Sequence, residues 1–112
     1  MAKMSCQMLV FSGQPNPRWQ LTKEQTAIFE KVFDASNQKG NWQEPSVLLG
    51  YRGCMIEIDG NDWFVFKGNI SQQSDSRVSR QDPSRSIEKF ILQSAPSKWN
   101  ALVSGIMDTE FK

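Results

Sequence analysis

Any catalysis by this chain has to rely on carboxylates or on a cysteine thiol, because the sequence contains no histidine. Histidine is the commonest general base and the commonest metal ligand near neutral pH, so its absence excludes every His-dependent catalytic triad. The sequence also has no phosphate-binding loop, no dinucleotide glycine fingerprint and no spaced cysteine cluster. We therefore expect a protein that is not an enzyme and that holds no cofactor.

Two groups of residues are the remaining candidates for chemistry. Cys54 follows Arg52 and Gly53, and a nearby cation lowers the pKa of a thiol, but the sequence offers it neither a base nor an oxyanion-stabilising group. Oxygen ligands for a hard cation gather at Glu57, Asp59, Asn61 and Asp62. Their spacing does not match a calcium loop, and a turn explains them, so we expect no metal site. An enzyme using Cys54 or these carboxylates is the weakest of our hypotheses.

Cys6 and Cys54 are the two cysteines of the chain, and both fall in expected strands. They are either buried free thiols or one disulfide between strands, and the disulfide would indicate an oxidising compartment. The N-terminus lacks the features of a secretory signal, although a mature secreted form would look the same. The sequence Asn69-Ile70-Ser71 matches the N-glycosylation pattern, which is too common to decide anything.

Aromatic and proline residues indicate a binding surface more strongly. Four tryptophans in 112 residues is a high number, and three of them, Trp19, Trp42 and Trp63, are expected in loops or at strand ends. Such rings stack on sugar or peptide faces, or else close the ends of a core. Pro15 and Pro17 stiffen the loop that presents Arg18 and Trp19, and they bias the residues before them toward extended backbone.

A second candidate surface is an anion site near the start of the second expected helix. Free backbone N–H groups at a helix start attract phosphate or sulfate, and Arg77, Arg80 and Arg85 flank the start at Asp82-Pro83-Ser84. A capped helix beside a solvated loop explains the same residues without any ligand.

The overall charge favours neither nucleic acid nor membrane as a partner. Thirteen basic and twelve acidic residues give a net charge of +1, so no strong field is present. The longest apolar stretches are far shorter than the roughly 18 residues that span a bilayer. We expect a protein partner or self-association, with a glycan as the alternative.

Hydrophobic spacing predicts the elements that position these residues. Alternation predicts a first strand at about residues 4–11, largely buried on both faces. Thr22 and Gln25 form a capping-box signal for a helix at about residues 23–37, with Ile28, Phe29, Val32 and Phe33 at helical spacing.

The second half predicts a hairpin, a loop and one or two helices. Residues 47–58 read as a strand, interrupted by Gly50 and Gly53, and Asp59-Gly60 turns it into a strand at residues 63–70. Residues 71–81 are polar enough for a mobile loop. A helix starts at Asp82 and Pro83 and is stopped by Pro96, and residues 97–107 form either a short helix or an edge strand.

These elements predict one α+β domain over residues 1–112. It has a small, mostly antiparallel sheet against two helices, or three, in the order β-α-β-β-α. The crossover through the first helix would be right-handed if its two strands were parallel neighbours.

Two segments resemble a small family of proteins that has no established activity. They are residues 11–19, F-S-G-Q-P-N-P-R-W, and residues 49–53, L-G-Y-R-G. In the family the first segment precedes a helix and the second opens a later strand. The resemblance implies a shared fold and a shared surface of Arg18, Trp19, Tyr51 and Arg52, but no mechanism. Cys54 and Met55 depart from the family pattern, which has larger aromatic or β-branched residues after the second segment.

The sequence thus leads to a non-enzymatic recognition or assembly module as the first hypothesis, including a self-associating structural protein. The proline loop and the Gly50-Tyr51-Arg52-Gly53 segment would hold the partner chain. A carbohydrate-binding domain with Trp19, Trp42 and Trp63 as a stacking platform is the alternative.

Overall fold

The computed structural model describes residues 4–11, 15–46 and 50–111. In this part of the chain, six strands form one antiparallel sheet in the order β2-β1-β3-β4-β5-β6. They are β1 (Met4–Met8), β2 (Arg18–Gln20), β3 (Cys54–Ile58), β4 (Asn61–Phe66), β5 (Asn69–Gln72) and β6 (Ser79–Gln81). The helices are α1 (Lys23–Ala35), α2 (Ser86–Gln93) and α3 (Asn100–Glu110), with short 3₁₀ turns η1 (Pro83–Arg85) and η2 (Ser97–Trp99).

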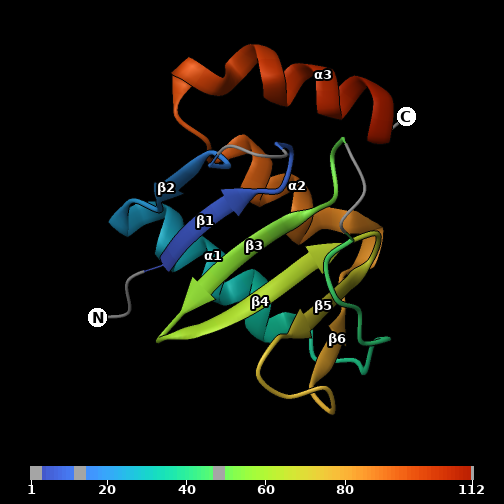
Figure 1. Cartoon of the computed structure of the whole chain (residues 1–112). Coiled ribbons are helices and arrows are strands. Elements are labelled where there is room, and N and C mark those ends of the chain that lie inside the picture. Colours follow the sequence, from blue (N-terminus) through green and yellow to red (C-terminus); the bar gives the residue numbers. More distant parts are fainter. Residues whose placement is uncertain (1–3, 12–14, 47–49, 112) are drawn as a thin grey trace.

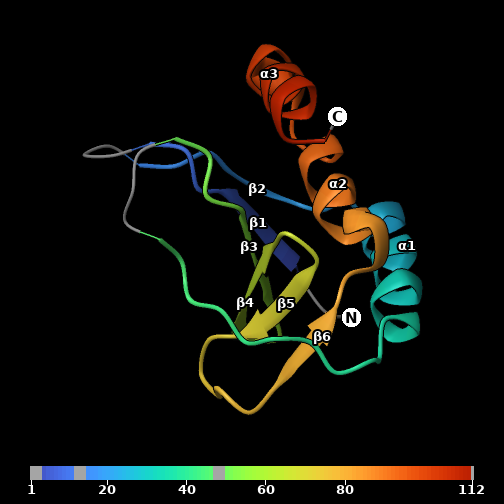
Figure 2. The same cartoon turned by 90° about the vertical axis from the view of Figure 1, so that its right-hand side faces the viewer.

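The helices are not distributed evenly around the sheet. Helices α1 and α2 cover one face, whereas α3 lies beyond the end of the sheet where β1 finishes and β3 begins (Figures 1 and 2). The expected α+β class is therefore confirmed. The expected order β-α-β-β-α was too short, because it contained three strands. The neighbours β1 and β3 are antiparallel, so the handedness rule for parallel crossovers does not apply.

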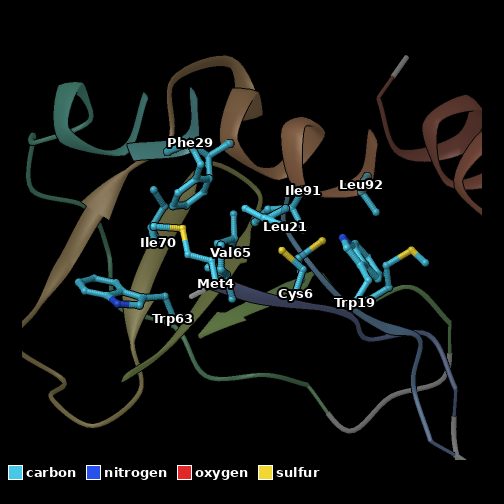
Figure 3. Close-up of a cluster of buried hydrophobic side chains, with 14 of the residues drawn as sticks. Met4, Cys6, Trp19, Leu21, Phe29, Trp63, Val65, Ile70, Ile91 and Leu92 are labelled. Carbon is cyan, nitrogen blue, oxygen red and sulfur yellow. The ribbon is translucent and has the colours of Figure 1, made fainter. Parts of the chain in front are cut away.

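The core lies between the sheet and the two helices that cover it. Met4 and Cys6 of β1 lie on this side with Val65 of β4, below Phe29 of α1 (Figure 3). Met8 and Ile56 are buried in the same cluster. The alternate residues Ser5 and Gln7 are only half-buried. The expectation that this strand is buried on both faces was wrong, since period-two alternation buries one set of side chains.

The first strand is also shorter than expected and ends at Met8 rather than at residue 11. Beyond it, the Leu9 N–H donates to the Gly53 carbonyl at 3.0 Å and the Leu9 carbonyl accepts from Arg52 N–H at 2.8 Å. The expected strand at residues 47–58 starts only at Cys54. Its first three residues, 47–49, lie outside the described part of the chain.

Two hairpins with two-residue turns follow, of which the sequence pattern predicted one. Asp59 and Gly60 have φ angles of 51° and 82° and join β3 to β4, as the Asp-Gly signal predicted. Lys67 and Gly68 have φ angles of 47° and 87° and join β4 to β5. Positive φ at both turn residues is the geometry that suits the twist of paired strands. The expected strand at residues 63–70 is therefore two strands.

Residues 71–81 begin within β5 and end within β6, so the expected loop is limited to the residues between these strands. The outer edge of β6 is paired with the chain after α1. Gly40 N–H donates to the Ser79 carbonyl at 3.3 Å, and Gln81 N–H donates to the Gln38 carbonyl at 2.8 Å. Only glycine fits at position 40, because a Cβ would overlap the Arg80 carbonyl. The side chains of β6 are polar, but its backbone pairs with β5 on one side and with residues 38–40 on the other.

The helix signals were largely right. The capping box between Thr22 and Gln25 is present, and α1 ends at Ala35, two residues before the expected end. Residues 97–107 take the helical alternative, as η2 and α3. The Asp82-Pro83 signal opens a 3₁₀ turn, and α2 starts later, at Ser86. The Asp82 carboxylate accepts the N–H groups of Ile87 and Glu88, at 2.8 and 3.0 Å, and so still caps α2.

Candidate functional site

An open groove of about 380 Å³ separates α3 from two loops at the end of the sheet. One wall consists of Val10, Phe11, Gly50 and Tyr51. The other wall, from α3, consists of Ala101, Leu102, Gly105, Ile106, Thr109 and Glu110. We call this feature the α3 groove.

Helix α3 is held at its two ends, and its middle both packs against the core and lines the groove. At the start, the Trp99 ring packs against Phe11 with ring centroids 6.5 Å apart. At the other end, Arg85 Nη1 donates to the Glu110 carbonyl at 2.9 Å, and the Arg85 guanidinium lies 4.1 Å from the Phe111 ring centroid. Within α3, all of which is described, Ile106 is the one buried residue.

Gly105 keeps the α3 wall low. A Cβ added at this position would meet no atom within 4 Å, and its φ is in the ordinary range. A side chain would therefore project into the groove without steric conflict.

Side-chain hydrogen bonds join the backbone segments of the opposite wall. Asn16 Oδ1 accepts the N–H groups of Val10 and Phe11, at 2.9 and 2.7 Å. Arg52 Nη2 donates to the Phe11 carbonyl at 2.7 Å. The proline loop and the Gly50–Gly53 segment, which the sequence singled out separately, thus lie side by side in this wall.

Tyr51 connects the groove to a buried ionic cluster. Its hydroxyl donates to Glu88 Oε2, and its ring packs edge-on against Phe66 with centroids 5.8 Å apart. Glu88 is fully buried, and it also accepts from Lys67 N–H at 3.0 Å and from Arg85 Nε and Nη2 at 3.0 and 2.9 Å. The donors to this carboxylate thus come from three places, namely Tyr51 of the groove wall, Lys67 of the second hairpin turn and Arg85 of η1.

The pKa values of the Tyr51 hydroxyl and of both cysteine thiols are raised. Burial raises the pKa of Tyr51 above its ordinary value, and the neighbouring Cys54 and Glu88 raise it further. Burial also raises the pKa of Cys54, and it raises the pKa of Cys6 to about 12. Both cysteines are buried and free, as the first of the two alternatives expected. A nucleophilic cysteine needs a thiolate at neutral pH, and neither thiol provides one.

The three tryptophans of the expected binding surface do not share an exposed face. Trp19 and Trp63 are each 8% exposed. The Trp19 ring points toward the helices (Figure 3), and the Trp63 ring packs edge-on against Phe33 with centroids 5.2 Å apart. Trp19 Nε1 donates to Ser94 Oγ at 2.9 Å. Trp42 is half-buried, and its Nε1 donates to the Gln72 carbonyl at 2.8 Å. The glycan alternative stays a hypothesis, but these rings form no stacking platform for it.

Arg18 is exposed, on the face of the sheet opposite the helices. It borders a shallow depression of about 110 Å³ with Gln7, Glu57 and Asp62. The surface that the family resemblance implied is therefore divided, since Tyr51 lines the α3 groove, Arg52 braces the Phe11 carbonyl behind it, and Trp19 belongs to the core.

The arginines of the expected anion site are also dispersed. Arg77 pairs with Asp75 at the exposed tip of a turn. Arg80 Nη1 donates to the Phe33 carbonyl at 3.0 Å, and the guanidinium lies 4.2 Å from the Phe33 ring centroid. Arg85 belongs to the Glu88 cluster. Each guanidinium already has a partner, so the three do not converge on a common ligand.

No group of metal-binding side chains occurs among the described residues, and Glu57, Asp59, Asn61 and Asp62 simply surround the first hairpin turn. Within the same residues no helix is long and apolar enough to cross a membrane.

Comparison with protein-family models, curated proteins and solved structures found no match for this chain. The family resemblance of the two motifs remains a prediction, and function has to be argued from the geometry alone.

The α3 residues of the groove were not among the predicted binding residues. The signal was present in the sequence, since Leu102 and Ile106 lie one helical turn apart with Gly105 beside them. This spacing was used only as a sign of a helix, and the placement of α3 beyond the sheet makes these residues one wall of a groove.

Proposed function

We propose that this protein is a non-enzymatic recognition module that takes an apolar side chain of a partner polypeptide into the α3 groove. The observation that carries this proposal is the glycine at position 105. Glycine in a helix interior costs about 0.5–1 kcal/mol relative to alanine. At Gly105 neither a positive φ nor a close neighbour requires it.

No packing constraint requires the glycine, so its missing side chain only leaves space beside α3. Such space is expected where another molecule binds. The groove falls within the roughly 300–1,000 Å³ range of ligand sites in proteins. Its lining is mainly apolar or small, with the polar residues Thr109 and Glu110 at the end nearest the C-terminus of α3. This arrangement suits an aliphatic or aromatic side chain with a hydrogen-bond donor or a cation at one side.

The site offers recognition rather than catalysis. Tyr51 is engaged by Glu88, and its raised pKa keeps the hydroxyl protonated. The thiol of Cys54 lies 3.5 Å from the Tyr51 hydroxyl, and burial raises its pKa as well. The groups that a reaction would need are thus occupied in holding the wall in place.

Selection from a random displayed-peptide library tests the proposal, with the Gly105→Leu variant as the matched control. The leucine fills the groove and improves the helix propensity of α3, so the variant should fold. We expect peptides that share an apolar anchor, bind the wild type and shift the NMR signals of the Leu102 and Ile106 methyl groups. The variant should bind the same peptides at least tenfold more weakly. Peptides that bind both proteins equally, or a wild type that selects none, would contradict the proposal.

A further inference from the structure

Ile28 is the exposed large hydrophobic residue of the described chain, with 52% of its surface accessible. It lies on α1, on the side away from the core residue Phe29. Helical spacing places Glu24, Lys31 and Ala35 on the same side, and all three are exposed. We call these four residues the Ile28 stripe. A single apolar residue between two opposite charges is a small but specific surface.

The geometry points to a second copy of this chain as the occupant of the α3 groove, with Ile28 of one molecule inserted into the groove of the next. This inference rests on the proposed function and names the partner. Helix α1 lies on the helical face of the sheet, whereas α3 lies beyond the end of the sheet (Figures 1 and 2) and forms one wall of the groove. The Ile28 stripe and the α3 groove are thus separate surfaces of one molecule, so a contact between them joins two molecules.

The charges of the two surfaces are complementary in one orientation. Glu110 borders the groove at the C-terminal end of α3, where the helix dipole is negative and the last turn has no basic residue. Lys98 is exposed just before the start of α3. If α1 lies parallel to α3, Lys31 comes toward Glu110 and Glu24 comes toward Lys98. Ile28, between the two charges, then faces the middle of the groove and Gly105.

The sheet edges offer poor alternatives for self-association. The β6 edge is covered by residues 38–40. The β2 edge is three residues long and begins after Pro17, which has no N–H to pair. Short edge strands next to proline resist the addition of another strand.

A contact between two different surfaces of the same protein is heterologous, and it continues into a ring or an open chain. One side chain and two surface ion pairs make a weak interface, so assembly should appear only at high protein concentration and should weaken with salt. The net charge of +1 does not oppose this approach of many copies.

Analytical ultracentrifugation over a concentration series tests the inference with two variants. Ile28→Asp removes the inserted side chain and keeps the groove, whereas Gly105→Leu fills the groove and keeps Ile28. We expect the average mass of the wild type to rise with concentration and each variant to stay monomeric. An equimolar mixture of the variants should form dimers that grow no further, because each dimer has one competent interface.

Charge exchange tests the orientation. Lys31→Glu and Glu110→Lys should each weaken assembly, and the double variant should recover it. A wild type that is monomeric at every concentration, a variant that still assembles, or a mixture without dimers would overturn the self-association. Peptide selection by the groove would then still succeed if the proposed function is right, so the two failures are distinguishable.

Discussion

Glycine serves opposite purposes at positions 105 and 53. Gly105 has open space around its missing Cβ, whereas Gly53 has φ of 106° and a Cβ there would approach Phe64 and Phe66 to 2.9 Å. We expect Gly105→Ala to raise the free energy of unfolding by up to about 1 kcal/mol through helix propensity. Gly53→Ala should lower it by more than about 1 kcal/mol, through strain and overlap. Urea unfolding measures both, and a destabilised Gly105→Ala would show that position 105 is packed in solution.

Glu88 is the residue on which the site depends most for stability. Its carboxylate is fully buried and accepts from the Tyr51 hydroxyl, the Lys67 N–H and the Arg85 guanidinium. Removing one partner of a buried ion pair leaves the other uncompensated, so Glu88→Ala should cost about 3–5 kcal/mol. Tyr51→Phe removes one donor to this charged carboxylate and should cost less, about 1.5–3 kcal/mol. Equal losses for the two variants in urea unfolding would contradict this ranking.

Helix α3 depends on Arg85 for its position. The guanidinium donates to the Glu110 carbonyl, stacks on Phe111 and pairs with Glu88 at the same time. Lysine keeps the charge but lacks the planar fork that makes these contacts together. We expect Arg85→Lys to increase amide hydrogen exchange in the last turns of α3 by at least tenfold, with little change in β3 and β4. Arg77→Lys, at an exposed pair, is the matched control and should leave α3 exchange unchanged.

The elements that the sequence predicted well are those with local signals. Thr22 and Gln25 begin α1 through contacts three residues apart, and Asp59-Gly60 supplies the backbone angles of its own turn. Lys67 carries no such signal, since a lysine rarely adopts positive φ, and the second hairpin was therefore missed. The Lys67 N–H instead donates to the Glu88 carboxylate at 3.0 Å, and this contact with a distant element holds the turn. The second hairpin turn therefore depends on tertiary contacts, which the spacing of residues along the sequence does not show.

The candidate site was only half predictable for the same reason. The proline loop and the Tyr51-Arg52 segment stood out by composition, and they do form one wall. The arginine and tryptophan side chains beside them were predicted as binding residues because of their types. Trp19 instead completes the core, and Arg80 caps the C-terminal end of α1 through the Phe33 carbonyl. Residue type alone does not separate a ring that fills a core from one that awaits a ligand.

The whole molecule buries both of its thiols on the helical side of the sheet. Cys6 is 1% exposed and Cys54 is 0% exposed, so a reagent reaches them only when the fold opens. We expect iodoacetamide to label neither cysteine of the native protein at pH 8, and to label both in denaturing urea. Mass spectrometry of the intact protein gives the count. Rapid single labelling of the native protein would show a reactive thiol and would revive the catalytic hypothesis.

The same buried groups make the fold sensitive to alkaline pH. The pKa of Cys6 rises from its ordinary 9.0 to about 12 in the folded protein, chiefly through burial, and burial likewise raises the pKa values of Cys54 and Tyr51. Between pH 9 and about 12, the unfolded chain therefore binds fewer protons than the folded one. Stability must then fall as the pH rises, by up to about 1.4 kcal/mol per pH unit for each group.

Urea unfolding at a series of alkaline pH values measures this loss. Cys6→Ala changes the stability at neutral pH, but the informative quantity is the slope with pH, which should become shallower by up to about 1.4 kcal/mol per unit above pH 9. Below the ordinary thiol pKa, the wild type and the variant should show parallel curves, since neither state has lost a proton there. Parallel curves that continue up to pH 11 would mean that Cys6 ionises equally in the folded and unfolded chains, and that the sheet and α2 do not exclude water from it.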